Sequence, residues 1–288
     1  GTNRFSGTGY YFGRDEKLDA TNAFARSKVP FDQTRVGGSF GGPIVPNRTH
    51  FFASAEKLIV NNTTLVSLPA TNPFATLENG IFETPTRETL GALKIDHQLS
   101  DSHRVFVRYA YDNQQLGGAK NPLRDVGGGL MVGTTSTDSA IKAHSTVVQD
   151  SWVVSERVVN TLRGHYFKNY LATLPNSDTL GVVRPSFSWG QSSISPQIFD
   201  RWSVSAYDTL YLSTGAHDFK VGVDYAYDVF PFEAHFNEKG VFTFTTDAPF
   251  NAAVPATYPI SFTMQTPGLY EYRSHHVAAY AQDEWQIR

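Results

Sequence analysis

Long stretches of alternating apolar and polar residues constrain the fold of this chain more than any other feature. In RVFVRYAYD, residues 104–112, the valines and tyrosines fall on one side of an extended strand, and the arginines and the aspartate fall on the other. DFKVGVDYAYD, residues 218–228, repeats the arrangement. A strand of a soluble sandwich and a strand of a membrane barrel both fit this pattern, so periodicity alone leaves the two alternatives open.

Connection lengths favour the barrel. Alternation and turn residues predict ten strands, near residues 5–14, 33–44, 49–60, 87–99, 103–115, 139–154, 157–170, 202–213, 217–231 and 269–287. Short turns at 45–48, 100–102, 155–156 and 214–216 alternate with long connections, of which the last runs from about 232 to 268. Tight turns on one side and long loops on the other are typical of outer-membrane barrels, whereas long unstructured loops are uncommon in compact soluble domains.

Strand length and aromatic placement agree with a membrane barrel. A tilted strand needs about 9 to 11 residues to span a bilayer, and most of the predicted strands reach that length. The tetrapeptides QDSW, residues 149–152, and QDEW, residues 282–285, echo each other near the ends of two strands. This echo predicts that Trp152 and Trp285 lie at one membrane interface as part of an aromatic girdle, although a four-residue echo can also arise by chance.

Composition excludes several classes of protein. A net charge of −3 and a pI near 6.3 argue against a nucleic-acid-binding protein. Such a protein needs a stripe of basic residues, and the sequence has none. The absence of cysteine excludes disulfides and thiolate metal sites. The sequence has no apolar run near the roughly 18 residues of a spanning helix, which excludes a helical membrane protein but not a barrel, because alternating strands do not raise mean hydropathy.

The stretch RVGGSFGGPIVPNRTHFF, residues 35–52, carries two glycine pairs inside a predicted hairpin. It is not a phosphate-binding loop, since neither Gly-Lys-Ser nor Gly-Lys-Thr follows and Pro43 stands where the helix would begin. The glycines either make room for an interior plug or a bend of the wall, or they accommodate strong twist in the hairpin.

Candidate catalytic and metal-binding groups lack the required context. Ser139 and Lys142 form Ser-x-x-Lys, but on a predicted strand and without the companion motifs of that enzyme class. His275 and His276 are adjacent, so a strand directs them to opposite sides and they cannot chelate one metal. We therefore predict no enzyme activity, no metal site and no cofactor.

A family resemblance rests on GTNRFSGTGYYFGRDEKLDATNAFA at the start, PFDQTRVGGSFGGPIVPNRTHFFASAEK after it, and the two QDxW strand ends. Together these motifs look like the barrel of Oar-like TonB-dependent outer-membrane proteins. The resemblance is specific over roughly the first 60 residues and diffuse beyond them. It implies an all-β fold, namely an antiparallel transmembrane β-barrel segment of about ten long strands from a barrel of about 22.

Such proteins are normally far longer, so the resemblance implies that residues 1–288 are a partial TonB-dependent receptor-like barrel domain. The signal peptide, the plug, the TonB box and the remaining strands are expected outside it. Implied partners are outer-membrane lipid, a TonB-type energy-transducing complex acting through the plug, and an extracellular ligand that the sequence does not identify. The implied location is the outer membrane of a Gram-negative bacterium.

Active import of a scarce, large ligand such as a metal chelate, glycan or peptide is the expected function. The alternative is a surface adhesion or secretion-related barrel without active transport. Aromatic residues on the long connections are the candidate ligand-binding residues: Phe187, Trp189, Phe236, Phe250 and Tyr258. Packing among the loops is the competing explanation for them. The candidate lumen-facing polar residues are Arg104, Arg108, Asp112, Arg163, His165, Lys220, Asp224 and Asp228.

Overall fold

Ten long strands form one antiparallel sheet in the computed structural model, which describes residues 2–18, 20, 28, 30–119, 130–131 and 137–287. The strands are β1 (Ser6–Asp15), β2 (Asp32–Val45), β3 (Thr49–Asn61), β6 (Thr86–Ser100), β7 (His103–Ala119), β9 (Thr137–Ser155), β10 (Val158–Pro175), β13 (Gln197–Thr214), β14 (His217–Ala234) and β17 (Gly268–Trp285). All ten predicted strands are therefore confirmed. Gly1, Asp19 and residues 21–25 of the amino-terminal motif lie outside the described part of the chain.

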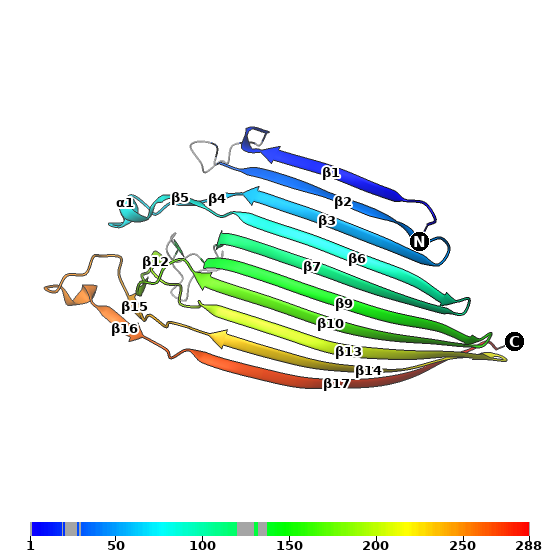
Figure 1. Cartoon of the computed structure of the whole chain (residues 1–288). Coiled ribbons are helices and arrows are strands. Elements are labelled where there is room, and N and C mark those ends of the chain that lie inside the picture. Colours follow the sequence, from blue (N-terminus) through cyan, green and yellow to red (C-terminus); the bar gives the residue numbers. More distant parts are fainter. Residues whose placement is uncertain are drawn as a thin grey trace.

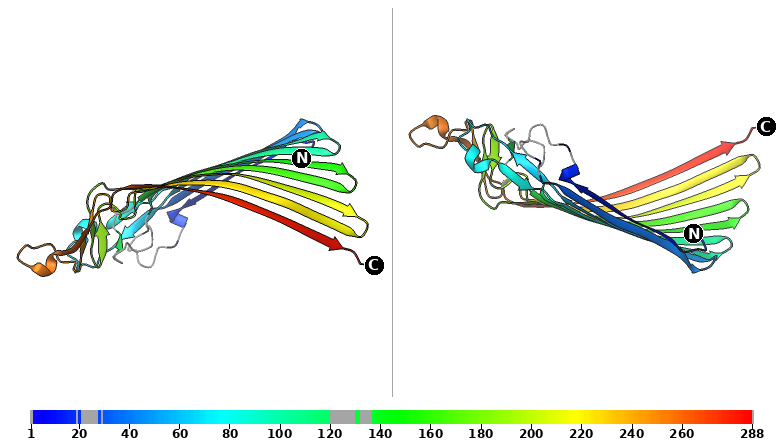
Figure 2. Two further views of the ribbon diagram at one scale, coloured as in Figure 1. Left: turned by 90° about the horizontal axis from the view of Figure 1, so that it is seen from below. Right: turned by 90° about the horizontal axis from the view of Figure 1, so that it is seen from above.

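The ten strands follow one another as a meander, in the order β1-β2-β3-β6-β7-β9-β10-β13-β14-β17. All short turns lie at one end of the sheet and all long connections at the other (Figure 1). Figure 2 shows that the sheet is strongly twisted and curved, with β1 and β17 as its two edges. Every ladder of this ten-stranded sheet is antiparallel, which fits a barrel wall in which each strand reverses direction.

Several strands continue beyond their predicted ends. β10 extends to Pro175, and β13 begins at Gln197 rather than near residue 202. The two strands remain paired there, with Thr173 opposite Gln197. Apolar and polar residues no longer alternate regularly in this region, so backbone pairing between neighbours, which the sequence of one strand does not show, sets these ends.

The sheet has two chemically different faces. Register places Val107 of β7 beside Val148 of β9, and Leu162 and Val204 share their face. We call this the apolar face; the opposite side, which carries Arg104, is the polar face. The four apolar side chains are 42 to 49% exposed although they lie on central strands. Apolar side chains that are this exposed on the central strands of a sheet suit contact with lipid better than contact with water. Within the described residues, no helix is long and apolar enough to cross a membrane.

The long connections build a second layer beyond the loop end of the sheet. A five-stranded sheet joins β16 (Pro259–Thr263), β15 (Val241–Phe244), β11 (Gly181–Val183), β12 (Phe187–Trp189) and β8 (Leu130–Met131). A separate hairpin pairs β4 (Thr63–Val66) with β5 (Gly80–Glu83), and the one-turn helix α1 (Ala75–Glu78) lies between them. Short 3-10 turns occur at Glu16–Leu18 and Pro255–Thr257. These short elements were not predicted. The five-stranded sheet is completed by pairings between different connections, β11 with β15 and β12 with β8, which the local sequence does not show.

The glycine pairs of β2 make room for neighbouring residues of the same wall. Gly42 lies under the ring of Phe5, and Gly37 lies under the hydroxyl end of Tyr10. A Cβ at Gly38 would lie 2.7 Å from the carbonyl oxygen of Thr8, too close for any side chain. Close approach of β1 therefore explains three of the four glycines directly, and a bend or a plug is not required for them.

Candidate functional site

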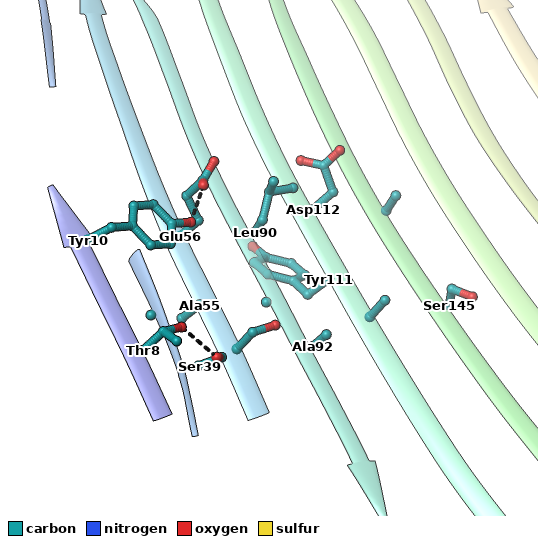
Figure 3. A pocket seen from close by; sticks show the side chains of 15 residues that line it. Thr8, Tyr10, Ser39, Ala55, Glu56, Leu90, Ala92, Tyr111, Asp112 and Ser145 are labelled. Atoms are coloured by element: carbon teal, nitrogen blue, oxygen red, sulfur yellow. Dashed lines mark hydrogen bonds between the residues drawn. The ribbon is translucent and has the colours of Figure 1, made fainter. Parts of the chain in front are cut away.

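A trough of about 520 Å³ lies across β1, β2, β3, β6, β7 and β9 (Figure 3). Its lining consists largely of short side chains and hydroxyl groups: Thr8, Tyr10, Gly38, Ser39, Ser54, Ala55, Glu56, Leu90, Gly91, Ala92, Ala110, Tyr111, Asp112, Ala143 and Ser145. Most of these residues belong to the polar face according to the strand register. The trough exists because glycine, alanine and serine follow one another across six strands, so the wall is thin there.

Hydrogen bonds orient the side chains at one end of the trough. The hydroxyl of Tyr10 donates to the carboxylate of Glu56, and the guanidinium of Arg35 lies 3.6 Å from the same carboxylate. The hydroxyls of Thr8 and Ser39 are 2.9 Å apart (Figure 3). Glu56 is thus oriented by two neighbours, which suits a carboxylate that accepts hydrogen bonds in a fixed direction.

The other end of the trough carries a second carboxylate, that of Asp112, and the hydroxyl of Ser145. Ser145 is also 3.0 Å from the Nε2 atom of His165. The whole trough thus offers two carboxylates and several hydroxyls over a base of small side chains. Such a surface accepts a polar segment or ligand that has hydrogen-bond donors.

Sequence reasoning identified Asp112 at this site but missed Tyr10, Glu56 and Ser145. These residues come from strands separated by long connections, and only the register of the sheet brings them together. The alternation in each strand does show which side each residue occupies, and that signal could have placed all of them on the polar face.

The residues predicted to face the lumen all lie on the polar face. Arg104 lies 3.2 Å from Asp96, and Arg163 donates to the side-chain oxygen of Gln149 over 2.9 Å. Asp228 accepts from Arg201 over 2.7 Å. The remaining members share this face by register: Arg108, Asp112, His165, Lys220 and Asp224. They come from three strands, β7, β10 and β14. Asp112 lines the trough itself, and His165 contacts it through Ser145.

The predicted ligand-binding aromatic residues fall into two groups. Phe187 is fully buried and stacks on Trp189, with ring centroids 5.4 Å apart, beside Val66 and Leu68. Three members lie elsewhere: Phe236 contacts Phe232, and Phe250 and Tyr258 face each other across 5.5 Å. Phe250 is 58% exposed and Tyr258 is 42% exposed, so this pair is accessible and Phe187 is not.

Arg184 contacts residues of two other long connections. It is 3% exposed, and its guanidinium carbon lies 4.0 Å from the ring centroid of Phe244 and 5.0 Å from that of Phe74. Its Nη1 atom donates to the carbonyl oxygens of Thr246 and Ala248 at 2.7 and 2.8 Å. Burial lowers the pKa of the Arg184 guanidinium, opposed by the charge of Asp247, yet arginine remains protonated at neutral pH.

His235 directly follows the last residue of β14, where the chain enters the layer built by the long connections. Its Nε2 atom is 2.7 Å from Glu233 Oε1, and its Nδ1 atom is 3.2 Å from Glu238 Oε2. The hydrogen bond with Glu233 is the main cause that raises the pKa of His235; burial opposes this shift and Glu238 adds to it. Both ring nitrogens can donate only in the imidazolium form, so the arrangement favours a charged histidine.

The two tryptophans of the QDxW echoes occupy equivalent positions. Trp152 on β9 and Trp285 on β17 both lie on the apolar face near the short turns, and they are 46% and 60% exposed.

Among the described residues, no group of three or more histidine, aspartate or glutamate side chains could hold a metal ion.

The comparisons with known proteins fit this geometry. The family model described as "Outer membrane beta barrel domain" matches residues 1–92 and 64–288. The chain belongs to this outer membrane β-barrel family. Its location is therefore the outer membrane. No curated protein matches the sequence of this barrel domain.

Among solved structures, the barrel domain is similar to the outer membrane transporter YddB from Escherichia coli. The TM-score is 0.62 and the sequence identity is 10%, over 99% of this chain and 38% of the transporter chain. At this identity the likeness shows a shared fold only. The domain spans well under half of the length of that protein.

Proposed function

We propose that this domain forms part of the barrel of a TonB-dependent, Oar-like outer-membrane receptor that imports a scarce ligand too large for a porin. The observation that carries the proposal is the polar trough on one face of a wall whose other face is apolar. The likeness to an outer membrane transporter and the interlocked layer of long connections support it. A barrel of about 22 strands, the size of plugged transporters, would accommodate this wall as a segment.

In this proposal the polar face lines the lumen, and the trough accepts a segment of the plug. The TonB-type complex acts on that plug from the periplasm. The connections beyond the sheet bind the extracellular ligand, with Phe250 and Tyr258 as the accessible aromatic groups. The domain itself has no catalytic or cofactor role.

Adhesion or another surface interaction is the second candidate function. The exposed pair of Phe250 and Tyr258 favours it, because exposed aromatic residues are enriched at binding surfaces and need no transport machinery.

The decisive experiment compares ligand uptake and surface attachment in cells that carry the full-length gene, with and without TonB. Import predicts uptake of one member of a panel of chelates, glycans and peptides that is lost without TonB, while attachment is unchanged. If no member is taken up in a TonB-dependent manner and Phe250→Ala reduces attachment, adhesion replaces import.

A further inference from the structure

Two strand pairs of the wall carry the same three-residue arrangement at the short-turn end. In the first, His103 of β7 meets Asp150 and Trp152 of β9; in the second, His217 of β14 meets Asp283 and Trp285 of β17. His103 Nε2 is 2.8 Å from Asp150 Oδ2, and His217 Nδ1 is 2.7 Å from Asp283 Oδ2. We call each group a His-Asp-Trp triad.

The stacking within the triads is also repeated. The ring centroids of His103 and Trp152 are 5.6 Å apart with an interplanar angle of 24°, and those of His217 and Trp285 are 5.5 Å apart at 13°. The intervening strand β10 does not form the arrangement with β13, because Val158 and Leu212 occupy the corresponding positions. Two separate copies with matching geometry indicate a specific local role for these residues.

The triads lie at the border of the apolar face. Asp150 is directly opposite Val105, and Asp283 is directly opposite Phe219. Val105 and Phe219 are the first apolar residues of this face that follow His103 and His217 in the direction away from the short turns. Further along the same two strand pairs, six residues from His103 and eight from His217, Tyr109 bonds to His144 across 2.7 Å and Tyr225 bonds to His275 across 3.0 Å. Between His103 and Tyr109, or His217 and Tyr225, lie roughly 20 to 26 Å of strand at about 3.3 Å per residue. Strands of outer-membrane barrels are tilted by about 35 to 45°, so this length of strand covers roughly 14 to 21 Å of an apolar band about 25 Å tall.

The triads therefore face lipid headgroups on the short-turn side, which is the periplasmic leaflet in this class of barrel. A carboxylate has about four acceptor positions, and the histidine occupies at most two of them. The side chains of Asp150 and Asp283 retain 38% and 36% exposure. An indole face beside a carboxylate attracts a cation, and a primary ammonium can also donate hydrogen bonds to the carboxylate.

We propose that each His-Asp-Trp triad is a binding site for the ethanolamine headgroup of a phospholipid in the periplasmic leaflet. The ammonium group donates to the aspartate and lies against the tryptophan. A choline headgroup keeps the attraction to the indole but has no N–H group, so the sites distinguish the two lipids. This inference rests on the outer-membrane location and on the short turns facing the periplasm, and it does not depend on import.

The test uses the full-length protein in lipid nanodiscs with 5-fluorotryptophan, observed by ¹⁹F NMR. Residues 1–288 contribute 4 tryptophans to that protein. Trp→Phe variants assign their signals, and Trp189 and Trp202 report that the fold is intact. Titrating phosphatidylethanolamine into phosphatidylcholine discs should shift the Trp152 and Trp285 signals, with a preference of about threefold or more for ethanolamine, a size typical of exposed charge pairs.

Asp150→Asn should abolish the preference at Trp152 and leave Trp285 unchanged, and Asp283→Asn should do the reverse. Ser151→Ala and Glu284→Gln are the matched controls, because these residues are adjacent to the aspartates but lie on the polar face. Identical signals in the two lipids would overturn the proposal. So would a preference that persists in both asparagine variants, because the indole alone would then account for it.

Discussion

At the scale of single residues, the closest packing in the wall occurs where β1 meets β2. Gly9 and Gly38 are direct partners across these two strands. Their environments differ, since a Cβ at Gly9 meets nothing within 4 Å, whereas a Cβ at Gly38 would meet the backbone oxygen of Thr8 at 2.7 Å. Backbone atoms cannot turn aside as a flexible side chain can, so only one glycine of the pair is sterically required.

We therefore expect Gly38→Ala to lower the free energy of unfolding by about 1 to 3 kcal/mol, the usual cost of overpacking. Gly9→Ala is the matched control and should be close to neutral or slightly stabilising, because alanine fits a strand better than glycine. Urea unfolding of the bilayer-inserted protein measures both. Equal effects of the two substitutions would show that β1 does not approach β2 as closely as the structure indicates.

At the scale of elements, each long strand separates side chains of the apolar face from side chains of the polar face. On β7, Val107 is 42% exposed on the apolar face, and Ala110 lines the trough on the polar face. The two residues lie three positions apart on the same strand. They therefore allow the faces to be compared within one strand.

Val107→Arg should impair assembly into the outer membrane, at a cost of about 2 to 4 kcal/mol if the site lies near the bilayer midplane. Ala110→Arg should be tolerated better, since its side chain extends into a polar trough. The folded fraction in outer-membrane preparations, read from heat-dependent gel mobility, measures the difference. Equal tolerance at both positions would contradict the assignment of the faces.

The sequence predicted the ten long strands but not the layer beyond them, for a physical reason. Alternation is a local property, so RVFVRYAYD reveals its two faces without knowledge of its neighbours. Arg184 and Phe187 are different: their partners come from connections about 60 and 110 residues away along the chain. The trough has the same origin, because Glu56 and Asp112 become neighbours only through the register of the sheet.

At the scale of the whole molecule, the wall ends in two unpaired strands. β1 and β17 are the edges of the ten-stranded sheet, and β17 is exposed along nearly its whole length. Val277 on β17 is 78% exposed and Leu269 is 76% exposed. Long apolar edge strands pair readily with other chains.

Residues 1–288 expressed alone should therefore aggregate, whereas the same residues within the full-length protein should not. Light scattering after refolding, with and without detergent, tests this expectation. The polar face supplies too little apolar area for a soluble core, so detergent should reduce the scattering. A soluble monomer with sharp, cooperative unfolding would contradict the membrane wall and favour a sandwich.

The buried guanidinium of Arg184 also constrains how such a protein can diversify. It contacts Phe74 from one connection and Phe244 from another, while Arg184 itself belongs to a third. A substitution in any of these three connections that alters this packing disturbs the other two. Changes of surface specificity are thus expected to arise through coordinated replacement of several connections, with exposed tips such as the one around Phe250 free to vary first.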